Sequence, residues 1–485
     1  MEIEALKELV NEVQRQKSER QNIELKSCNG GFPKRIYDTL SSFSNQDSGG
    51  VIIFGMTDKP SYEICGVYDP EDVQKKIMEN CKQMFPEVRA LITMCEINGK
   101  MIVAAEIPGV ETVYRPVYYA GVGRIKGSYI RIGDADEPMN EYEVYSYEAF
   151  RRRVRDDLRV VDRAKAEMFD NEKIEAYLKA VKQDKGNLTG NVPDSDILEL
   201  MGITDGRKPT LAGTMVFIRF PQIFFPQLCI TAVVIPGTEI GELGNDGERF
   251  IDNQRIQGSI SNMLEEATAF VRKNSRTKTI IGEDGMRHDK TEYPMKAVRE
   301  AILNALVHRD YSLHTENTPI SIEMYRDRME IKSSGGLYGN FSVDTLGKSR
   351  PETRNAALAN ILEILKVTEN RYSGIPTIYR ECEKAGLPKP EFKVVRGDFT
   401  VIFKNNMYYN VEKYNVEKPT IANMEDAILS FCTIPRSRNE LLGLTGKSRY
   451  YTMTKWIYPL IANGKLKMTL PDKPKSTHQK YYTVQ

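Results

Sequence analysis

The sequence predicts a multidomain α+β protein, and three observations lead to this prediction. The chain has 485 residues, a length that corresponds to about three domains of ordinary size. Short apolar runs bounded by turn residues predict strands, whereas longer segments with apolar residues three and four apart predict amphipathic helices. A tandem repeat of Y-N-V-E-K at 409–418 separates a basic last segment from the rest.

The composition narrows the possible classes of protein. Lysine and arginine number 68 against 67 aspartates and glutamates, so any contact with nucleic acid must come from local patches of charge. The seven cysteines form no C-x-x-C pair and the four histidines form no ligand cluster, which argues against a zinc site and fits reduced thiols. No apolar run approaches about 18 residues and no signal peptide opens the chain, so we expect a soluble, cytoplasmic protein without membrane contact.

Residues 1–150 are predicted to form a first domain. Apolar residues at helical spacing predict an opening helix over 3–17, and a second helix is expected over 33–45. The apolar run V-I-I-F-G is typical of a buried strand, and Asp58 stands just beyond its end. Asn98-Gly99 between two apolar runs predicts a β-hairpin.

Four motifs within 18–147 resemble the Alba-like domain of the Schlafen family: E-x-x-x-x-E-L-K, S-F-S-N-x-x-x-G-G-V-I-I-F-G, I-C-G-V and Y-I-R-I-G. In nuclease members of that family, three carboxylates bind a divalent metal, and the enzyme cuts structured RNA such as tRNA. The resemblance implies that Glu19, Glu24 and Asp58 are the metal-binding and catalytic residues, with Mg²⁺ or Mn²⁺ as the cofactor.

The chemistry of phosphodiester cleavage agrees with this set of carboxylates. The reaction needs a nucleophilic water and charge relief at phosphorus, and a carboxylate-held Mg²⁺ or Mn²⁺ supplies both. Lys26 shares a strand face with Glu24, and we expect it to act as a catalytic residue that steadies the pentacovalent oxyanion. The alternative is that Glu19 and Glu24 are surface charges that pair with Arg20 and Lys26.

Basic residues later in the same segment are candidates for holding a nucleic-acid backbone, with tyrosines interleaved for base stacking. The basic residues are Arg115, Arg124, Lys126 and Arg131, and the tyrosines are Tyr114, Tyr118, Tyr119 and Tyr129. We therefore expect the first domain to bind RNA, DNA or both.

Residues 151–292 carry no recognisable chemistry, and we expect a connecting scaffold of helical and mixed α/β structure. A run of arginines opens this segment; such a run is usually a solvated helix face, and a basic rim that continues the nucleic-acid surface is the alternative. The predicted elements are a charged helical stretch to about residue 185, a short helix over 195–201, strands over 214–220 and 227–235, and an amphipathic helix over 257–273.

A helix over 294–310 is predicted to organise a further domain, 293–404. Proline is tolerated in a first helical turn, and neither Gly nor Pro follows for about four turns. An apolar stripe at helical spacing marks the buried side of this helix, and its members are Val298, Ile302, Ala305 and Leu306.

Three polar residues, Glu300, Asn304 and His308, form one row beside that stripe. Burying a carboxylate, an amide and an imidazole on a helix costs free energy unless a ligand or another polar group interacts with them. The alternative is a surface row on an amphipathic helix, with His308 as a satisfied core histidine or as a hydrogen-bonding support for Asn304.

Glu300-x-x-x-Asn304 resembles the N-box of the GHKL ATP-binding fold. The segments P-I-S-I-E-M-Y, M-E-I-K-S-S-G-G-L, T-R-N, Y-S-G-I-P and G-L-P-K-P-E-F follow in an order similar to a divergent GHKL module of bacterial transcriptional regulators. In GHKL proteins the Asn holds a Mg²⁺ that bridges the phosphates, and the Glu polarises the attacking water. The resemblance implies an ATP site made of Glu300, Asn304, His308, Ser333, Gly335, Gly336, Arg354, Asn355, Ser373 and Gly374, with Asn304 as its metal ligand.

This chain departs from the GHKL pattern at the residue that reads the base. The adenine-reading Asp of the D-x-G-x-G box is replaced by Ser333 or Ser334 before Gly335-Gly336. A hydroxyl accepts an amine hydrogen bond more weakly than a carboxylate does. ATP binding is therefore expected, whereas ATP hydrolysis is the least favoured activity.

After a linker over 405–420, residues 421–485 resemble a winged helix, with three helices and a terminal β-hairpin wing. Ten basic residues against four acidic ones give this segment a net charge of +6. The candidate nucleic-acid contacts are Lys447, Arg449, Tyr450, Lys465 and Lys467. A protein–protein or dimer contact is the alternative use of such a module.

Two functional hypotheses of different classes follow. The first is a metal-dependent endoribonuclease gated by a nucleotide-sensing GHKL-like module, an architecture suited to stress response or phage defence. The second is an ATP-responsive DNA-binding transcriptional regulator without nuclease activity. Family analogy also predicts a homo-oligomer, because GHKL modules are often used in pairs.

Overall fold

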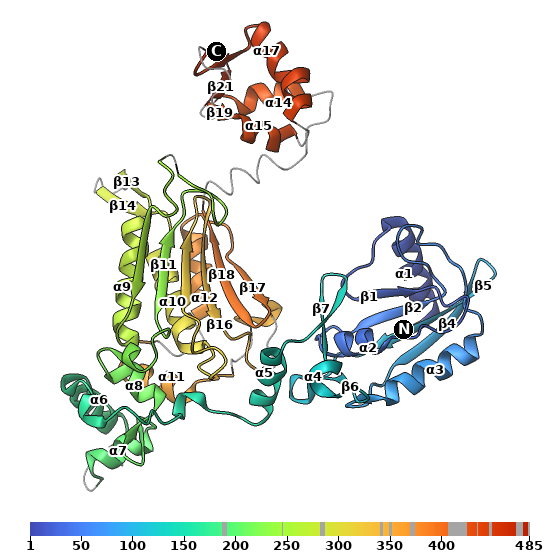
Figure 1. Cartoon of the computed structure of the whole chain (residues 1–485). Helices are drawn as coiled ribbons and strands as arrows, with labels where there is room; N and C mark the ends of the chain where they lie inside the picture. Colours follow the sequence, from blue (N-terminus) through green and yellow to red (C-terminus); the bar gives the residue numbers. More distant parts are fainter. Residues whose placement is uncertain are drawn as a thin grey trace. The chain divides into compact units, whose positions relative to one another are not determined.

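The computed structural model describes residues 1–186, 192–244, 246–281, 287–339, 343–348, 352–368, 374–405, 424–433, 435–445, 449–471 and 479–483. The chain divides into two compact units (Figure 1). Unit 1 holds nearly all of the residues up to Phe403, and unit 2 consists chiefly of Lys404–Gln485. Within the described ranges, every helix is too short or too polar to cross a bilayer.

The first sheet of unit 1 has the strand order β1-β2-β5-β4. β1 and β2 are parallel, and the other pairs are antiparallel. Helix α1 covers one face, and α2 and α3 cover the other (Figure 1). The bounds are α1 Ile3–Gln16, β1 Ile23–Lys26, α2 Tyr37–Ser44, β2 Gly50–Phe54, α3 Pro70–Lys82, β4 Leu91–Ile97 and β5 Lys100–Ile107.

The alternation of side chains along each strand divides this core in two. Ile52 packs with α2 and α3, whereas Ile53 packs with α1, because successive side chains of a strand point to opposite faces. On the edge strand β1, Ile23 and Leu25 join the α1 side. Glu24 and Lys26 of β1 therefore share the opposite face, on the α2 side, and their common face confirms the sequence prediction.

A hairpin and a helix complete this part of the chain. The hairpin β7–β8 turns at Gly133 and Asp134 and sets Arg131 opposite Asp136. Helix α5 begins with a capping box in which Asn140 and Glu143 satisfy each other's backbone N–H groups. The bounds are β3 Met84–Phe85, β6 Tyr118–Tyr119, α4 Gly123–Gly127, β7 Tyr129–Ile132, β8 Ala135–Pro138 and α5 Glu141–Arg151.

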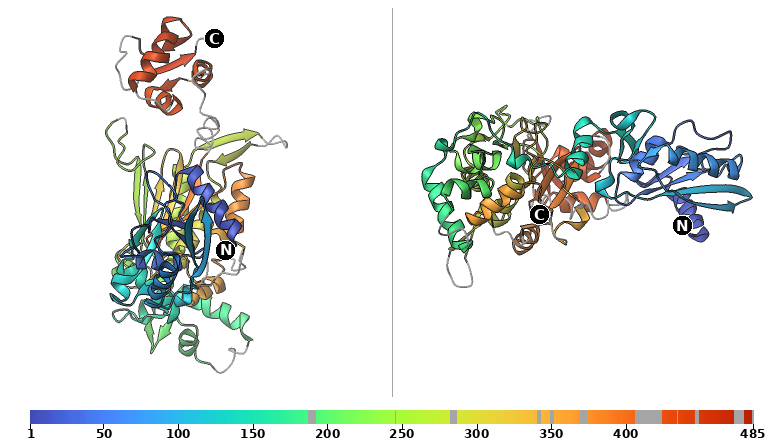
Figure 2. Two further views of the ribbon diagram at one scale, coloured as in Figure 1. Left: turned by 90° about the vertical axis from the view of Figure 1, so that its right-hand side faces the viewer. Right: turned by 90° about the horizontal axis from the view of Figure 1, so that it is seen from below.

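The second large sheet has six strands in the order β12-β11-β15-β16-β18-β17, with β11 and β15 parallel. Helices α9, α10 and α12 pack together in a layer against it, as Figure 1 and Figure 2 show. The bounds are β11 Ile230–Val234, β12 Asp252–Ile256, α9 Ile260–Asn274, α10 Met295–His308, β15 Ile320–Met324, β16 Arg328–Ser334, α12 Gly374–Lys384, β17 Glu391–Val395 and β18 Asp398–Lys404.

The strands of this sheet come from both sides of residue 292, where the sequence predicted a boundary between two segments. The strands β11 and β12 come from the segment expected to be a connecting scaffold, yet they pair within the same sheet as β15 to β18. The strand expected over 227–235 and the helix expected over 257–273 are confirmed as β11 and α9. The scaffold segment is therefore partly a component of the second fold.

Two expectations in the same segment were wrong. The strand predicted over 214–220 is the helix α8, Leu211–Phe217, in which every residue is buried. Burial on all sides removes the periodicity that separates a helix from a strand. The charged helical stretch also breaks, because α5 ends at Arg151 and 3₁₀ turns precede α6, Asn171–Asp184.

Smaller elements connect these parts of unit 1. Their bounds are α7 Asp194–Leu200, β9 Thr204–Asp205, β10 Lys208–Pro209, β13 Thr277–Ile281, β14 Arg287–Thr291 and α11 Ala356–Ile364, with 3₁₀ turns at Thr112–Tyr114, Asp156–Leu158, Ala166–Met168, Pro221–Ile223 and Val343–Thr345. One of them, α11, follows directly on Arg354 and Asn355 and so positions two candidate site residues.

The start of α11 is held by a buried carboxylate from far away in the sequence. Asp157 Oδ2 accepts hydrogen bonds from the backbone N–H groups of Ala357 (2.7 Å) and Leu358 (3.3 Å). We expect Asp157→Ala to lower the free energy of unfolding by about 1–3 kcal/mol, because two buried donors lose their acceptor. Asp162→Ala removes an exposed carboxylate that pairs with Lys208 and is expected to change it by about 0.5 kcal/mol or less. Urea titration compares the two, and equal losses would contradict this role for Asp157.

Unit 2 has its own core, built from helices and a three-stranded sheet of order β19-β21-β20. Ile428, Leu441, Trp456 and Leu460 are buried together in it. The bounds are α14 Met424–Phe431, β19 Arg436–Ser437, α15 Arg438–Thr445, α16 Arg449–Thr452, a π-helical turn Met453–Ile457, α17 Tyr458–Ala462, β20 Leu466–Met468 and β21 Lys480–Thr483. This mixture of helices and small antiparallel strands is compatible with the winged helix expected here, whose assignment stays a prediction.

Candidate functional site

The first candidate site is centred on Glu24, whose two carboxylate oxygens are both paired. Lys26 Nζ lies 2.6 Å from Glu24 Oε1, and Arg131 Nη2 lies 3.0 Å from Glu24 Oε2. The alternation of I-E-L-K places Glu24 and Lys26 on one face of β1, and the β7–β8 hairpin supplies Arg131. The structure therefore shows Glu24 in the salt bridge with Lys26 that was expected as the alternative to metal binding.

Arg131 is one of the most deeply buried charges of the domain, with 1% of its side chain exposed. Besides Glu24 it pairs with Asp136 Oδ1 at 2.8 Å, and it donates to the carbonyl oxygens of Gln21 (3.1 Å) and Ile23 (3.2 Å). Burial alone would lower the pKa of Arg131, but Asp136 and Glu24 raise it above its ordinary value. The guanidinium therefore stays charged.

Glu24 and Asp58 both lie within electrostatic reach of Glu19. Burial is the largest cause that raises the pKa of Glu19, and the negative charges of Glu24 and Asp58 raise it further; a hydrogen bond from the Leu25 N–H and the charge of Arg131 act in the opposite direction. In the parts of the chain that the structure describes, no three His, Cys, Asp or Glu side chains are grouped so as to hold a metal ion. The carboxylates are thus electrostatically coupled but not assembled around one point.

The ligand type and the charge of Glu19, Glu24 and Asp58 decide whether a divalent cation fits them. Carboxylate oxygens are the ligands that Mg²⁺ and Mn²⁺ prefer, and the repulsion that Glu19 experiences from Glu24 and Asp58 is of the kind that a cation relieves. Glu24 and Asp136 together already balance Lys26 and Arg131, so Glu19 and Asp58 provide the uncompensated charge. The set fits a cation in type and charge, and a shared ion would have to draw the three side chains together, because they form no ready-made cluster in the described residues.

The raised pKa of Glu19 predicts how its removal changes stability with pH. A carboxyl group with a raised pKa favours folding below its ordinary pKa of about 4.3, and this contribution is lost as the pH rises through the raised value. We therefore expect Glu19→Gln to be more stable than the wild type at pH 7, on the order of 1 kcal/mol, and equal to it near pH 4. Melting temperatures at the two pH values test this, and a pH-independent difference would contradict it.

Two of the predicted nucleic-acid contacts need correction. Arg115 is buried, pairs with Asp47 Oδ1 at 2.7 Å and donates to the Val110 carbonyl at 2.7 Å. Arg131 is buried between Glu24 and Asp136. Neither guanidinium faces solvent, and each is paired with a carboxylate, as a buried charge must be. Both therefore act inside the domain. The sequence prediction failed because residue type alone does not reveal burial.

The other predicted basic contacts lie nearer to solvent. Lys126 is exposed, whereas Arg124 is partly exposed and pairs with Glu148. In unit 2, Lys465 and Lys467 are exposed on and beside β20. Lys447 lies outside the described residues, and for Arg449 and Tyr450 only the backbone is described.

The second candidate site lies along α10. Val298, Ile302 and Leu306 are buried, which confirms the predicted apolar stripe. On the neighbouring row, Asn304 Nδ2 donates to Glu300 Oε1 at 3.3 Å. A Cβ atom on Gly374, at the start of α12, would lie 2.5 Å from Glu300 Oε1, so the backbone of α12 begins directly against this pair.

A buried ion pair lies where α10 ends. Asp310 Oδ2 pairs with Arg354 Nη1 at 2.8 Å and accepts a hydrogen bond from Tyr142 Oη at 2.7 Å, while Oδ1 accepts from the Ser312 N–H at 2.8 Å. Burial by itself would raise the pKa of Asp310, but Arg354 and these hydrogen bonds hold it below its usual range. Tyr142 is in α5, so this helix contributes to the second site.

The Ser-Ser-Gly-Gly segment lies against the same ion pair. Asp310 N–H donates to the Ser334 carbonyl at 2.8 Å. Gly335 has a φ of +105°, and a Cβ atom on it would lie 2.7 Å from the Asp310 nitrogen and 2.8 Å from Arg354 Nη1. Glycine is required at this position, because a side chain there would be strained and would clash.

The remaining predicted nucleotide-site residues have different environments. Ser333 is buried and Gly336 half-buried. Asn355 is fully buried and donates to the carbonyls of Val307 and Arg309, both at 2.8 Å, so it caps the end of α10. His308 is an exposed residue at the end of α10, although burial of its imidazole among neighbouring groups, together with the charge of Arg354, lowers its pKa to about 4. Ser373 lies outside the described residues.

Comparison with known families assigns two segments. Residues 19–140 match the family "Schlafen, AlbA_2". We call this N-terminal segment the Schlafen-like domain. Residues 317–403 match the family described as "Putative ATP-dependent DNA helicase recG C-terminal", and we call this segment the ATPase-like region.

Two solved structures resemble the chain only weakly. The DIP2311 protein from Corynebacterium diphtheriae is 16% identical, with 92% of this chain and 91% of that chain covered and a TM-score of 0.39. The N-terminal domain of a RecG-related protein from Nitrosomonas europaea is 25% identical, with 27% of this chain and 90% of that chain covered and a TM-score of 0.23. A search of curated proteins found no match.

Sequence reasoning missed two acidic residues next to the candidate sites. Asp136 of the Schlafen-like domain faces Arg131 across a hairpin, and Gly133-Asp134 between the two strands was the signal that would have predicted this register. Asp310 closes the stretch that predicted α10, but its pairing with Tyr142 joins residues 168 positions apart. No local pattern reveals such a contact.

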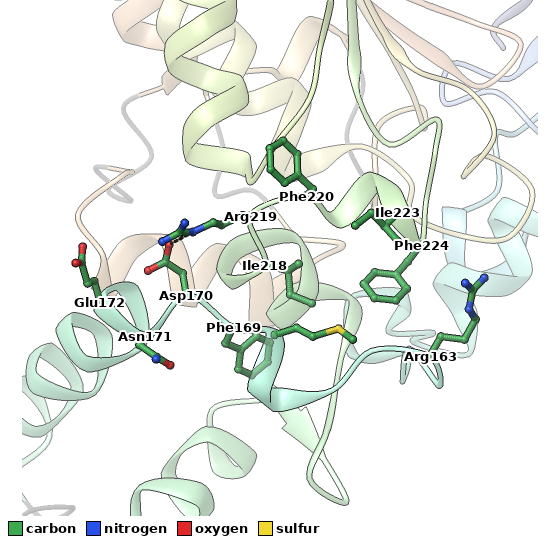
Figure 3. Close-up of a pocket in the computed structure, with 11 residues that line it drawn as sticks. Arg163, Phe169, Asp170, Asn171, Glu172, Ile218, Arg219, Phe220, Ile223 and Phe224 are labelled. Atoms are coloured by element: carbon green, nitrogen blue, oxygen red, sulfur yellow. Dashed lines mark hydrogen bonds and ion pairs between the residues drawn. The ribbon is translucent and has the colours of Figure 1, made fainter.

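A cavity of about 730 Å³ lies elsewhere in unit 1 (Figure 3). Phe220, Ile223 and Phe224 line one side of it, and Asp170 pairs with Arg219 at 2.9 Å on another. None of the predicted site residues lines this cavity. The carboxylates of the Schlafen-like domain and the α10 site are therefore separate from it.

Proposed function

We propose that this protein binds nucleic acid through its Schlafen-like domain and cleaves structured RNA, such as tRNA, with the help of a divalent cation. The observation that carries the proposal is the electrostatic coupling of three acids, since the charges of Glu24 and Asp58 both raise the pKa of Glu19. A set of acids on a domain that binds a polyanion repels its own ligand unless a cation joins them.

In this proposal Glu19, Glu24 and Asp58 would hold Mg²⁺ or Mn²⁺, which would supply an activated water and neutralise charge at the phosphorus. Lys26 remains partly exposed beside Glu24, so its ammonium can also pair with a phosphate oxygen of the RNA. Arg131 is enclosed and does not reach the substrate. Exposed basic residues such as Lys126 hold the RNA backbone.

The ATPase-like region and the preceding helix α10 act together in this proposal as a nucleotide sensor. Glu300 and Asn304 form a pair against the start of α12, and Asn304 would hold the Mg²⁺ of a bound ATP. The base-reading carboxylate is absent from the Ser-Ser-Gly-Gly segment, and the nearby Asp310 is already engaged by Arg354 and Tyr142. Binding without rapid hydrolysis is the expected behaviour, in a homo-oligomer formed through this region.

Cleavage of a folded RNA by the full chain tests the proposed function. The purified protein is incubated with tRNA or with duplex DNA of similar length, in Mn²⁺, in Mg²⁺ or in EDTA. We expect RNA to be cut at discrete positions in the presence of either metal, with no cutting in EDTA and slower or no cutting of the DNA. Absence of cleavage under all conditions, with the protein shown to be folded, would overturn the nuclease proposal.

A DNA-binding transcriptional regulator is the second candidate, and the exposed lysines of unit 2 favour it. Lys465 and Lys467 project from a small, independently packed module whose sequence carries a net charge of +6 over 421–485. This candidate predicts salt-sensitive binding to a discrete DNA site, weakened by Lys447→Ala or Arg449→Ala. DNA binding that survives removal of residues 421–485 would exclude it.

A further inference from the structure

We infer that Arg131 is a positioning residue of the acid site, which fixes the carboxylate of Glu24 for cleavage without touching the RNA. This inference rests on the proposed function, because it assigns a role within the same site. It differs from the sequence-based expectation, which placed Arg131 on the nucleic-acid surface. The geometry of the guanidinium carries the argument.

The guanidinium of Arg131 is a bridge between two acids. One nitrogen, Nη2, lies 3.0 Å from Glu24 Oε2, and the other, Nη1, lies 2.8 Å from Asp136 Oδ1. The remaining nitrogen, Nε, donates to the Gln21 carbonyl at 3.1 Å. The planar, rigid fork of an arginine is suited to such a role, because it fixes several acceptors at once.

The far end of this bridge is anchored to helix α2. Asp136 Oδ2 accepts a hydrogen bond from Thr39 Oγ1 at 2.6 Å, and Oδ1 accepts from Ser42 Oγ at 2.5 Å. The face of the Arg131 guanidinium also lies 5.1 Å from the centre of the Phe43 ring. The orientation of Arg131 is therefore set by a helix that contributes none of the three predicted metal ligands.

The near end of the bridge completes the fixation of Glu24. Lys26 Nζ lies 2.6 Å from Oε1, and Arg131 holds Oε2, so both oxygens of the carboxylate have a defined place. The four charges of Glu24, Asp136, Lys26 and Arg131 sum to zero. Loss of Arg131 leaves two acids with one lysine, and Glu24 can then turn toward Lys26.

The consequence for catalysis is specific. A misplaced Glu24 lowers the rate of the chemical step, whereas RNA affinity depends on exposed basic residues that Arg131 does not contact. Groups that orient a metal ligand typically change metal affinity or activity by about 10–100-fold when removed. Arg131 is thus expected to influence kcat and Mn²⁺ affinity rather than KM.

The test compares Arg131→Gln and Arg131→Lys with a core variant in the full-length protein. Ile77→Ala truncates a fully buried core side chain of α3 that has no part in the acid site, and it serves as a control for lost stability. We expect both Arg131 variants to lower kcat for tRNA cleavage by at least about tenfold, with KM within about threefold. Arg131→Lys keeps the positive charge but replaces the rigid, planar fork with a single ammonium nitrogen, which does not hold the two acids in the same geometry.

The outcomes separate this inference from the proposed function. If Arg131→Lys is folded and cleaves as fast as the wild type, or if both Arg131 variants lose no more activity than Ile77→Ala, the positioning role is excluded while the nuclease proposal stands. If the wild type itself does not cleave, the nuclease proposal fails. In that case, Mn²⁺ affinity that is equal in the wild type and in Arg131→Lys excludes the positioning role as well.

Discussion

Glu24→Gln is expected to abolish RNA cleavage and to leave RNA binding intact or tighter. The substitution keeps the size of the side chain but removes the charge that pairs with Lys26 and Arg131. Loss of a residue that serves the chemical step typically costs about 10²–10⁴-fold in rate. Binding persists because one negative charge that repels the RNA backbone is gone.

Binding and cleavage are to be measured in parallel on the same preparations. Glu4→Gln is the matched control, because Glu4 is 81% exposed on α1 and pairs only with Lys7 among the contacts that the structure describes. We expect Glu4→Gln to bind and cut RNA like the wild type. A Glu24→Gln protein that retains full cleavage would remove Glu24 from the active site, and a transcriptional regulator would be largely unaffected by either substitution.

Arg354→Met is expected to destabilise the protein strongly, by about 3–5 kcal/mol, because it leaves the carboxylate of Asp310 buried without its cationic partner. Tyr142→Phe removes only the hydroxyl that donates to the same carboxylate and is expected to cost about 1 kcal/mol. Denaturant titrations measure both losses. Lys208→Met is the control, since it breaks an exposed pair with Asp162 and is expected to cost about 1 kcal/mol or less.

The pH dependence of the same pair provides an independent measurement. The pKa of Asp310 lies below its ordinary range because Arg354 and hydrogen bonds outweigh burial. A carboxyl group of this kind contributes stability above its unfolded pKa of about 3.9, and the contribution is lost as the pH falls through the lower, folded value. The deficit of Arg354→Met is therefore expected to shrink as the pH falls below about 4, and a deficit that is constant with pH would contradict this account.

The sequence predicts the local features of both candidate sites well. Alternation in I-E-L-K places Glu24 and Lys26 on one face of β1, and the helical spacing of Val298, Ile302 and Leu306 predicts the buried side of α10. These predictions succeed because strand and helix periods are fixed by backbone geometry. They depend only on residues close together in the chain.

Partners that are distant in the sequence are not predicted by such patterns. The pairing of Arg131 with Glu24 joins a hairpin to an edge strand, and Tyr142 reaches Asp310 from another part of unit 1. Arginine in a strand is expected at the surface, so the burial of Arg131 was not foreseen. Helix α8 was also missed, because a segment that is buried on every side shows no periodicity.

The central claim is that Glu19, Glu24 and Asp58 share one divalent cation. Titration of the nucleotide-free protein with Mn²⁺, with the unbound ion followed by electron paramagnetic resonance, measures this directly. The account predicts one site whose affinity falls at least about tenfold in each of Glu19→Gln, Glu24→Gln and Asp58→Asn, and is unchanged in Glu4→Gln. Equal Mn²⁺ affinity in the wild type and in all three acid variants would contradict it.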